Sequence, residues 1–181
     1  MLIRIWYKPT YMIIDTYRPG SWQRGVQKLA ALPIFSDILA HVLHRLDPMV
    51  LNTSRGKNTA TTLLTGLPVI WLTTTGARSG KFRTTPLVCI PVEDRLVLVA
   101  SNFGSDHNPS WYHNLKANPE VQIKVNGIQA RCLSQEVFSP EYESLWEIAI
   151  EMYPGYASYK QRANGRHIPL ISLTALEQSS G

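Results

Sequence analysis

The chain has 181 residues, of which 44% are hydrophobic and 17% charged, enough to bury the core of one domain. Because no apolar run approaches the roughly 18 to 20 residues of a membrane-spanning helix and the N-terminus lacks a secretory pattern, we expect neither a span nor secretion. The two cysteines, Cys89 and Cys132, form no zinc spacing and no CxxC pair. We therefore expect a reduced, cytoplasmic protein without a metal site.

The formal net charge of +5 is concentrated near the N-terminus. Residues 1–60 carry eight Lys or Arg side chains against three Asp, whereas basic and acidic side chains balance in residues 61–181. A nucleic-acid-binding protein needs a basic face on its folded core, so we expect no nucleic-acid partner. Residues 1–32 mix aromatic and basic side chains, which leaves open a peripheral contact with the inner face of the cell membrane.

Residues 34–46 predict an amphipathic helix, because their apolar side chains recur at helical spacing. We expect this helix to pack on the core or on a partner subunit. The polar stretch 52–65 is typical of a linker. These features divide the chain into an N-terminal helical extension with its linker, residues 1–66, and a domain formed by residues 67–181.

The domain is predicted to be mainly β. Alternating and β-branched patterns predict strands at 69–75, 83–91, 95–101, 121–126, 128–137 and 168–173. Helices are predicted at 109–116 and 139–153, with Asn108 and Ser139 as their caps. Connections this short do not allow parallel crossovers. The fold class is therefore α+β, mainly β: an antiparallel barrel with helices on its flanks.

A first candidate site is the segment 74–86, whose turn joins two predicted strands. It carries Arg78, Lys81 and Arg83 with no acidic residue between them, and its glycines allow several backbone amides to point one way. Such groups bind phosphates and carboxylates. The alternative is an ordinary charged hairpin tip. Neither a Walker loop nor a dinucleotide fingerprint is present.

A second candidate is the segment 100–119, where a strand leads through a polar loop into a helix. Trp111 and Tyr112 suit the wall of a planar ring, although both also suit packing of the helix on the barrel. Asp106, His107 and His113 match no standard metal spacing.

A third candidate is a tyrosine series around a Pro-Gly break. Tyr153, Tyr156 and Tyr159 are spaced by three residues. The pattern favours a mobile cover over a pocket, with phenols that donate hydrogen bonds to a substrate oxygen. Packing with exposed hydroxyls is the alternative.

Taken together, these motifs resemble one known family. They read T-T-T-G-x-[RK]-[ST]-G-x-x-R-x-x-P at 73–86, A-S-N-x-G at 100–104, N-P-x-W-Y-x-N-L-K-A-N-P at 108–119, M-Y-P-x-Y-x-x-Y at 152–159 and I-P-L-I-S-L at 168–173. The order is similar to that of the deazaflavin (F420)-dependent nitroreductases, which include F420H2-dependent quinone reductases. The resemblance implies a split β-barrel related to flavin-mononucleotide (FMN)-binding barrels.

The resemblance also implies roles for individual residues. The F420 phosphate and polyglutamate tail would be held by Arg78, Ser79, Gly80 and Arg83. The matching positions around the deazaflavin ring are Ala100, Ser101, Asn102, Ser110, Trp111, Tyr112, Asn114 and Tyr156. The implied catalytic residues are Ser101, Tyr153, Tyr156 and Tyr159. Some members have a lysine directly after the serine, where this chain has Asn102.

The expected activity is transfer of a hydride from reduced F420 to a small-molecule acceptor: a quinone, an activated enone or a nitroaromatic compound. The alternatives are an FMN-binding oxidoreductase on the same barrel and a non-catalytic module that binds F420 or a lipid-like ligand. A homodimer also remains open.

Overall fold

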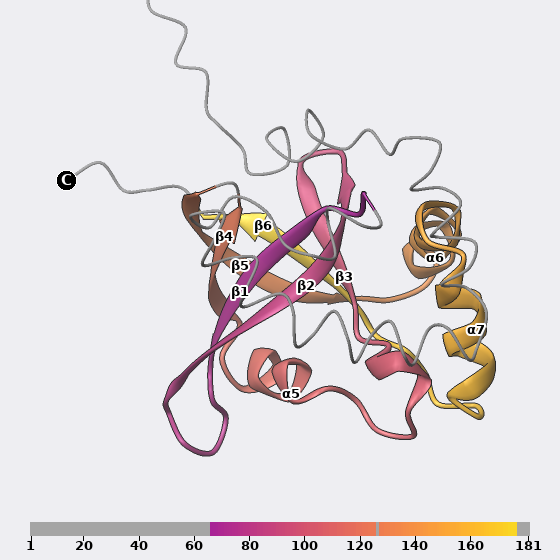
Figure 1. Cartoon of the computed structure of the whole chain (residues 1–181). Helices are drawn as coiled ribbons and strands as arrows, with labels where there is room; N and C mark the ends of the chain where they lie inside the picture. Colours follow the sequence, from indigo (N-terminus) through magenta and orange to yellow (C-terminus); the bar gives the residue numbers. More distant parts are fainter. Residues whose placement is uncertain (1–65, 126, 177–181) are drawn as a thin grey trace, which may run out of the picture.

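The computed structural model describes residues 66–125 and 127–176, which form an antiparallel barrel with flanking helices (Figure 1). The strands are β1 (Val69–Thr75), β2 (Phe82–Val92), β3 (Arg95–Val99), β4 (Glu120–Val125), β5 (Ile128–Val137) and β6 (Leu170–Ala175). The barrel closes in the order β1-β2-β3-β6-β5-β4, and every pair is antiparallel. The predicted fold class is confirmed. The predicted helix at 34–46, the linker and residues 1–32 lie outside the described residues.

The barrel interior follows from the period-two pattern of its strands. In β1 the side chains of Ile70, Leu72 and Thr74 are buried, while their neighbours are partly exposed. Ile70 and Leu72 join a cluster with Leu98 of β3 and Ile123 of β4. This cluster fills the barrel and fixes the register of β1, because a shift by one residue would turn its apolar side chains outward.

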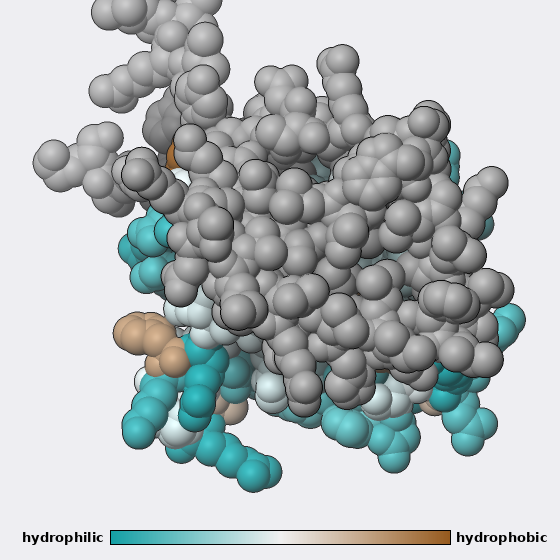
Figure 2. All heavy atoms as spheres, in the orientation of Figure 1, coloured by the Kyte–Doolittle hydropathy of each residue, from teal (hydrophilic) through white to brown (hydrophobic). Residues whose placement is uncertain are grey.

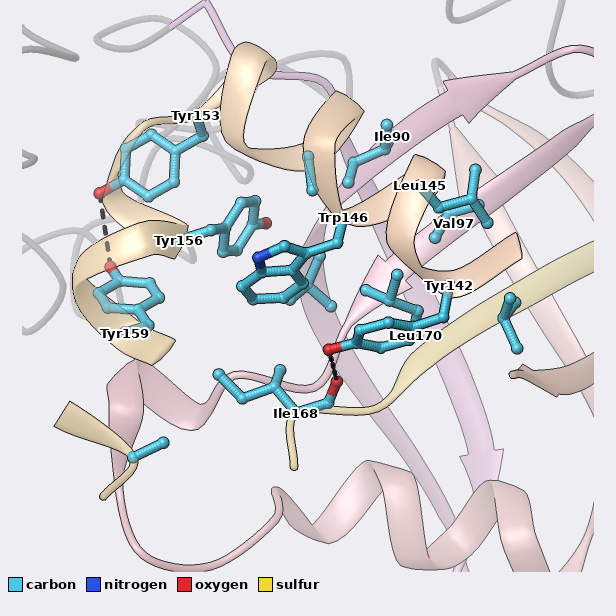
Figure 3. Packing of buried hydrophobic residues seen from close by; sticks show 14 of the residues in the cluster. Ile90, Val97, Tyr142, Leu145, Trp146, Tyr153, Tyr156, Tyr159, Ile168 and Leu170 are labelled. Atoms are coloured by element: carbon cyan, nitrogen blue, oxygen red, sulfur yellow. Dashed lines mark hydrogen bonds between the residues drawn. The ribbon is translucent and has the colours of Figure 1, made fainter. Parts of the chain in front are cut away.

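A second core lies between the barrel and two helices, α6 (Glu141–Met152) and α7 (Gly155–Arg162) (Figures 1 and 3). Strand β3 contributes to both cores. Leu96 and Leu98 point into the barrel cluster, whereas Val97 and Val99 belong to the cluster under the helices. A strand covered on both faces is apolar throughout, which explains the continuous hydrophobic run of β3.

Helix α6 packs through one face. Its buried residues Tyr142, Leu145, Trp146 and Ala149 are spaced as one stripe of a helix. The Tyr142 and Trp146 rings stack with centroids 6.0 Å apart, and the Tyr142 hydroxyl donates to the Ile168 carbonyl oxygen at 2.9 Å (Figure 3). This hydrogen bond satisfies the buried Tyr142 hydroxyl.

The helix starts differ from the prediction. Helix α5 (Ser110–Ala117) begins after Pro109 and α6 after Pro140, and neither start has a side-chain cap. Asn108 instead accepts a hydrogen bond from Arg166, and the Ser139 hydroxyl donates to Glu143 at 2.5 Å. Both predicted caps are therefore wrong, because each side chain has a stronger charged partner nearby.

Candidate active site

The sequence-predicted site segments gather at one end of the barrel. The β1–β2 turn, helix α5 and the short 3-10 helix η1 (Asn102–Gly104) lie along this end, and α7 packs against η1 (Figure 1). Helix α5 contacts β1, and α7 contacts η1, so segments about 40 and 57 residues apart in sequence meet at this end.

The β1–β2 turn is exposed. Residues 77–84 are all solvent-exposed, including Arg78, Ser79, Gly80 and Arg83. Figure 2 shows hydrophilic side chains projecting at this end of the molecule. The turn is closed by two backbone hydrogen bonds, from Gly76 N to Lys81 O at 2.9 Å and from Gly80 N to Gly76 O at 2.8 Å. Its cations are therefore presented on an ordered hairpin and remain accessible to an anion.

Asn114 of α5 attaches this turn to the rest of the site. Its Nδ2 donates to Thr74 Oγ1 at 3.0 Å, and its Oδ1 accepts from the Ala77 amide at 3.0 Å. One turn further along, Asn118 Nδ2 donates to the Thr75 carbonyl at 3.3 Å. Both the oxygen and the nitrogen of the Asn114 amide form hydrogen bonds within the protein. Asn114 therefore anchors the turn to α5, a role that was not predicted from the sequence.

The loop after β3 presents Ser101. Ala100 is fully buried and Ser101 is 8% exposed. Within residues 66–125 and 127–176, the Ser101 hydroxyl forms no hydrogen bond, while its carbonyl accepts from Gly104 N at 2.9 Å and from Arg166 Nη2 at 2.7 Å. The Asn102 side chain donates to the His107 carbonyl at 3.1 Å, inside the loop. The hydroxyl of Ser101 is thus left for another partner.

Helix α5 uses its aromatic residues mainly for packing. Trp111 is 7% exposed and lies with Leu115 in the barrel cluster, whereas Ser110, the first helical residue, is exposed. The Tyr112 hydroxyl donates to Glu136 Oε2 of β5 at 3.1 Å, and Lys116 Nζ binds the same atom at 3.0 Å. Burial, followed by the Glu136 charge, raises the pKa of Tyr112. These contacts correspond to the packing alternative for both aromatic residues.

The three tyrosines lie in the second core. Tyr153 is 9% exposed, and Tyr156 and Tyr159 are each 5% exposed, so the structure places them in packed positions and not in an exposed cover. The rings meet at 5.2 to 6.1 Å between centroids, and the Tyr153 and Tyr159 hydroxyls share a hydrogen bond at 3.4 Å (Figure 3). Burial raises the pKa of all three phenols. They therefore keep their protons at neutral pH.

Two further observations complete the site. In the described part of the chain, no group of three or more His, Cys, Asp or Glu side chains is placed to hold a metal ion. Arg166, between α7 and β6, donates to several atoms of the Ser101 loop. Arg166 is not among the residues predicted from the sequence, because a single arginine after the Asn164-Gly165 turn matches no binding pattern.

The closed antiparallel barrel with its flanking helices is the split-barrel class of fold that the sequence motifs implied. The F420H(2)-dependent quinone reductase family profile matches residues 45–175. The chain belongs to this family, which confirms the resemblance.

Similar proteins agree with this assignment. An F420H(2)-dependent quinone reductase of Mycobacterium tuberculosis strain H37Rv is 39% identical over 112 residues, covering 59% of this chain and 73% of that protein. A solved structure described as an F420-H2 dependent reductase (FDR-A) is 37% identical, with a TM-score of 0.54 over 59% of this chain and 93% of the other. A domain-swapped dimer is 31% identical, with a TM-score of 0.56 over 76% and 95%.

Proposed function

We propose that this protein reduces quinones with reduced F420 as the hydride donor. The observation that carries the proposal is the attachment of the cationic turn to α5 through Asn114. It fixes the turn with its exposed guanidinium groups beside α5, at the end of the barrel where the loop after β3 presents Ser101. The relatives named as F420H(2)-dependent quinone reductases support the same activity.

The side chains at this end fit the chemistry of F420. Arg78 and Arg83 are exposed cations that suit its phosphate and carboxylates, and the Ser79 hydroxyl offers a neutral donor beside them. The loop 100–102 and the exposed Ser110 at the start of α5 offer polar groups for the ring system. Exposed cations at the turn and polar groups at the loop match a cofactor that has an anionic tail and a planar ring with polar edges.

Bound reduced F420 supplies the hydride. No acceptor for the Ser101 hydroxyl is found among the residues that the structure describes, so in this proposal it donates to the quinone oxygen on which negative charge develops. Tyr153, which follows α6, and Tyr156 and Tyr159 of α7 remain protonated because burial raises their pKa. Each phenol therefore keeps a hydrogen that it can donate to the same oxygen. In this proposal Ser101, Tyr153, Tyr156 and Tyr159 are the catalytic residues. A Tyr156→Phe protein that turns over at the full rate would exclude Tyr156 as the proton source.

Fluorescence polarisation tests the cofactor part of the proposal. F420 is titrated into wild-type protein, into Arg83→Ala and into Arg131→Ala, with FMN as competitor. Arg131 is a matched exposed arginine on β5, paired with Glu120 at 2.5 Å. We expect tight F420 binding that is weakened in Arg83→Ala and unchanged in Arg131→Ala. Preferential binding of FMN would overturn the cofactor assignment, and binding of F420 without benzoquinone reduction would support a non-catalytic binding module.

We propose that activated enones and nitroaromatic compounds are further acceptors. Each compound replaces benzoquinone in an assay that follows oxidation of reduced F420 by the protein.

We also propose a homodimer, which the domain-swapped relative supports. Light scattering measures the mass of the protein in solution and tests this proposal.

We propose that the chain divides into residues 1–66 and 67–181 and that the protein is cytoplasmic. We also propose that residues 1–32 contact the membrane, which rests on their charge and composition alone. Within the described residues, no helix has the length and apolarity needed to cross a membrane. Partitioning onto anionic vesicles that is unchanged by deletion of residues 1–32 would refute the contact.

A further inference from the structure

Arg166 binds the Ser101 loop with all three nitrogens of its guanidinium group. Nε donates to the Ser105 carbonyl at 2.9 Å, and Nη2 donates to the Ser101 carbonyl at 2.7 Å. Nη1 donates to Asn108 Oδ1, to the Ala100 carbonyl at 3.4 Å and to the carbonyl of His167, the next residue, at 3.3 Å. The loop 100–108 is therefore wrapped around a single cation.

The same loop contains unfavourable backbone geometry. Asn102, Phe103 and Gly104 have φ values of 46°, 55° and 81°, all in the left-handed region. Glycine adopts this region freely and asparagine tolerates it, whereas the Phe103 side chain disfavours it. Such geometry persists only where surrounding contacts hold it, and it is common at functional sites. The carbonyls bonded by Arg166 flank this left-handed stretch on both sides.

We propose that Arg166 is a positioning residue that holds the Ser101 loop in its binding conformation. This inference rests on the proposed function, because it takes the loop as part of the F420 and quinone site. The Ser101 carbonyl accepts from both Gly104 N and Arg166 Nη2, so the bond to Arg166 also secures the first turn of η1. Without it, the Ser101 hydroxyl loses its fixed direction.

A lysine cannot replace this arrangement. The Arg166 donors span acceptors at Ala100, Ser101 and Ser105, which requires the planar fork of a guanidinium group. A lysine ammonium keeps the charge but reaches these carbonyls from a single point. Arg166→Lys therefore separates geometry from charge, and Arg166→Ala removes both.

Two readouts besides activity test the proposal in the full chain. The first is the F420 dissociation constant of wild type, Arg166→Lys and Arg166→Ala, with millimolar guanidinium added to Arg166→Ala. The second is hydrogen exchange of the Gly104 and Ser105 amides, whose acceptors are the Ser101 and Asn102 carbonyls at 2.9 and 3.0 Å. The control is Arg95→Ala, since Arg95 is a partly buried arginine that pairs with Glu141 of α6, outside this loop.

We expect both Arg166 variants to weaken F420 binding about tenfold or more, which corresponds to ~1.4 kcal/mol. Guanidinium should restore part of the affinity of Arg166→Ala. The two amides should exchange faster in both variants, while Arg95→Ala changes neither readout. The proposal is overturned if Arg166→Lys binds F420 as wild type does, or if Arg95→Ala weakens binding equally at matched stability. If wild type itself fails to bind F420, the proposed function fails, whereas faster exchange in Arg166→Lys would still establish loop positioning.

Discussion

Gly104 joins the Ser101 loop to α7 so closely that a single methyl group tests the contact. A Cβ at this position would lie 2.8 Å from Arg162 Cβ, 2.9 Å from the Tyr159 carbonyl oxygen and 3.2 Å from Tyr159 Cα. The backbone of α7 cannot rotate away as a flexible side chain would. The φ of Gly104 is also +81°. Gly104→Ala therefore combines a backbone penalty with a steric one.

The two penalties have separable magnitudes. An L-residue in the left-handed region costs ~1–2 kcal/mol, and forcing an extra methyl into packed structure costs ~1–3 kcal/mol. We expect Gly104→Ala to lower the free energy of unfolding by about 2–5 kcal/mol. Gly127→Ala is the matched control, because Gly127 has a φ of +85° with no atom within 4 Å of its Cβ position. It should lose only the backbone part.

Urea unfolding at 25 °C, followed by circular dichroism, measures both variants. The slope m should stay at the wild-type value, so that midpoint shifts report stability. The excess loss in Gly104→Ala over Gly127→Ala then isolates the contact between η1 and α7. Equal losses in the two variants would refute the reasoning, since the close approach to Tyr159 would then cost nothing.

Three further predictions follow from the structure. Asn114→Ala should lower the free energy of unfolding by about 1–2 kcal/mol in urea titrations, because two hydrogen bonds to the β1–β2 hairpin are lost; an unchanged midpoint would contradict this. Burial raises the pKa of Tyr142 and Tyr156, so above pH ~10 the unfolded chain binds fewer protons than the folded protein. The melting temperature should therefore fall as the pH rises above ~10, and it should fall less steeply in Tyr156→Phe. A melting temperature that stays constant up to pH ~11 would contradict this. Burial raises the pKa of Cys132 to about 12, so iodoacetamide at pH 8 should label this thiol only after unfolding, as mass spectrometry would detect; labelling of native protein would show that the thiol is accessible.

The strands were predictable because their patterns are local. The period-two alternation in 69–75 and the turn residues after 92 and 125 mark the strand ends, and the structure places them within about two residues for most strands. The short connections between β1 and β2, β2 and β3, and β4 and β5 then required antiparallel pairing. The pairing of β1 with β4 closes the barrel and joins strands that are remote in sequence. No local residue pattern indicates which two strands form this pair.

The helix α7 could not be read from the same signals. Pro154 and Gly155 predicted the end of α6, but they also begin α7. The Tyr153 ring carbons lie 2.4 Å from the position of a Gly155 Cβ, so glycine is needed for the ring to pack there. This requirement comes from tertiary packing, which overrides local propensity.

The sequence indicated which segments could form the site, but it did not indicate the hydrogen bonds within them. The cationic turn and the Ser101 loop were found from residue types in order, and the roles assigned to them stay predictions. The bonding of Asn114 to the hairpin and of Arg166 to the loop was not predictable, because a hydrogen bond between residues 40 or 65 positions apart leaves no local pattern.

Strand β3 lies between the two cores and contributes side chains to both. Core substitutions that do not touch each other have additive effects on stability, whereas substitutions in contact interact. A variant inside the barrel, at Leu72, and one under the helices, at Trp146, should therefore combine additively. Neighbouring positions on opposite faces of β3, such as Val97 and Leu98, should not. Side chains around α7 can thus change with little effect on the barrel interior, so the helical layer can diversify while the barrel beneath it is preserved.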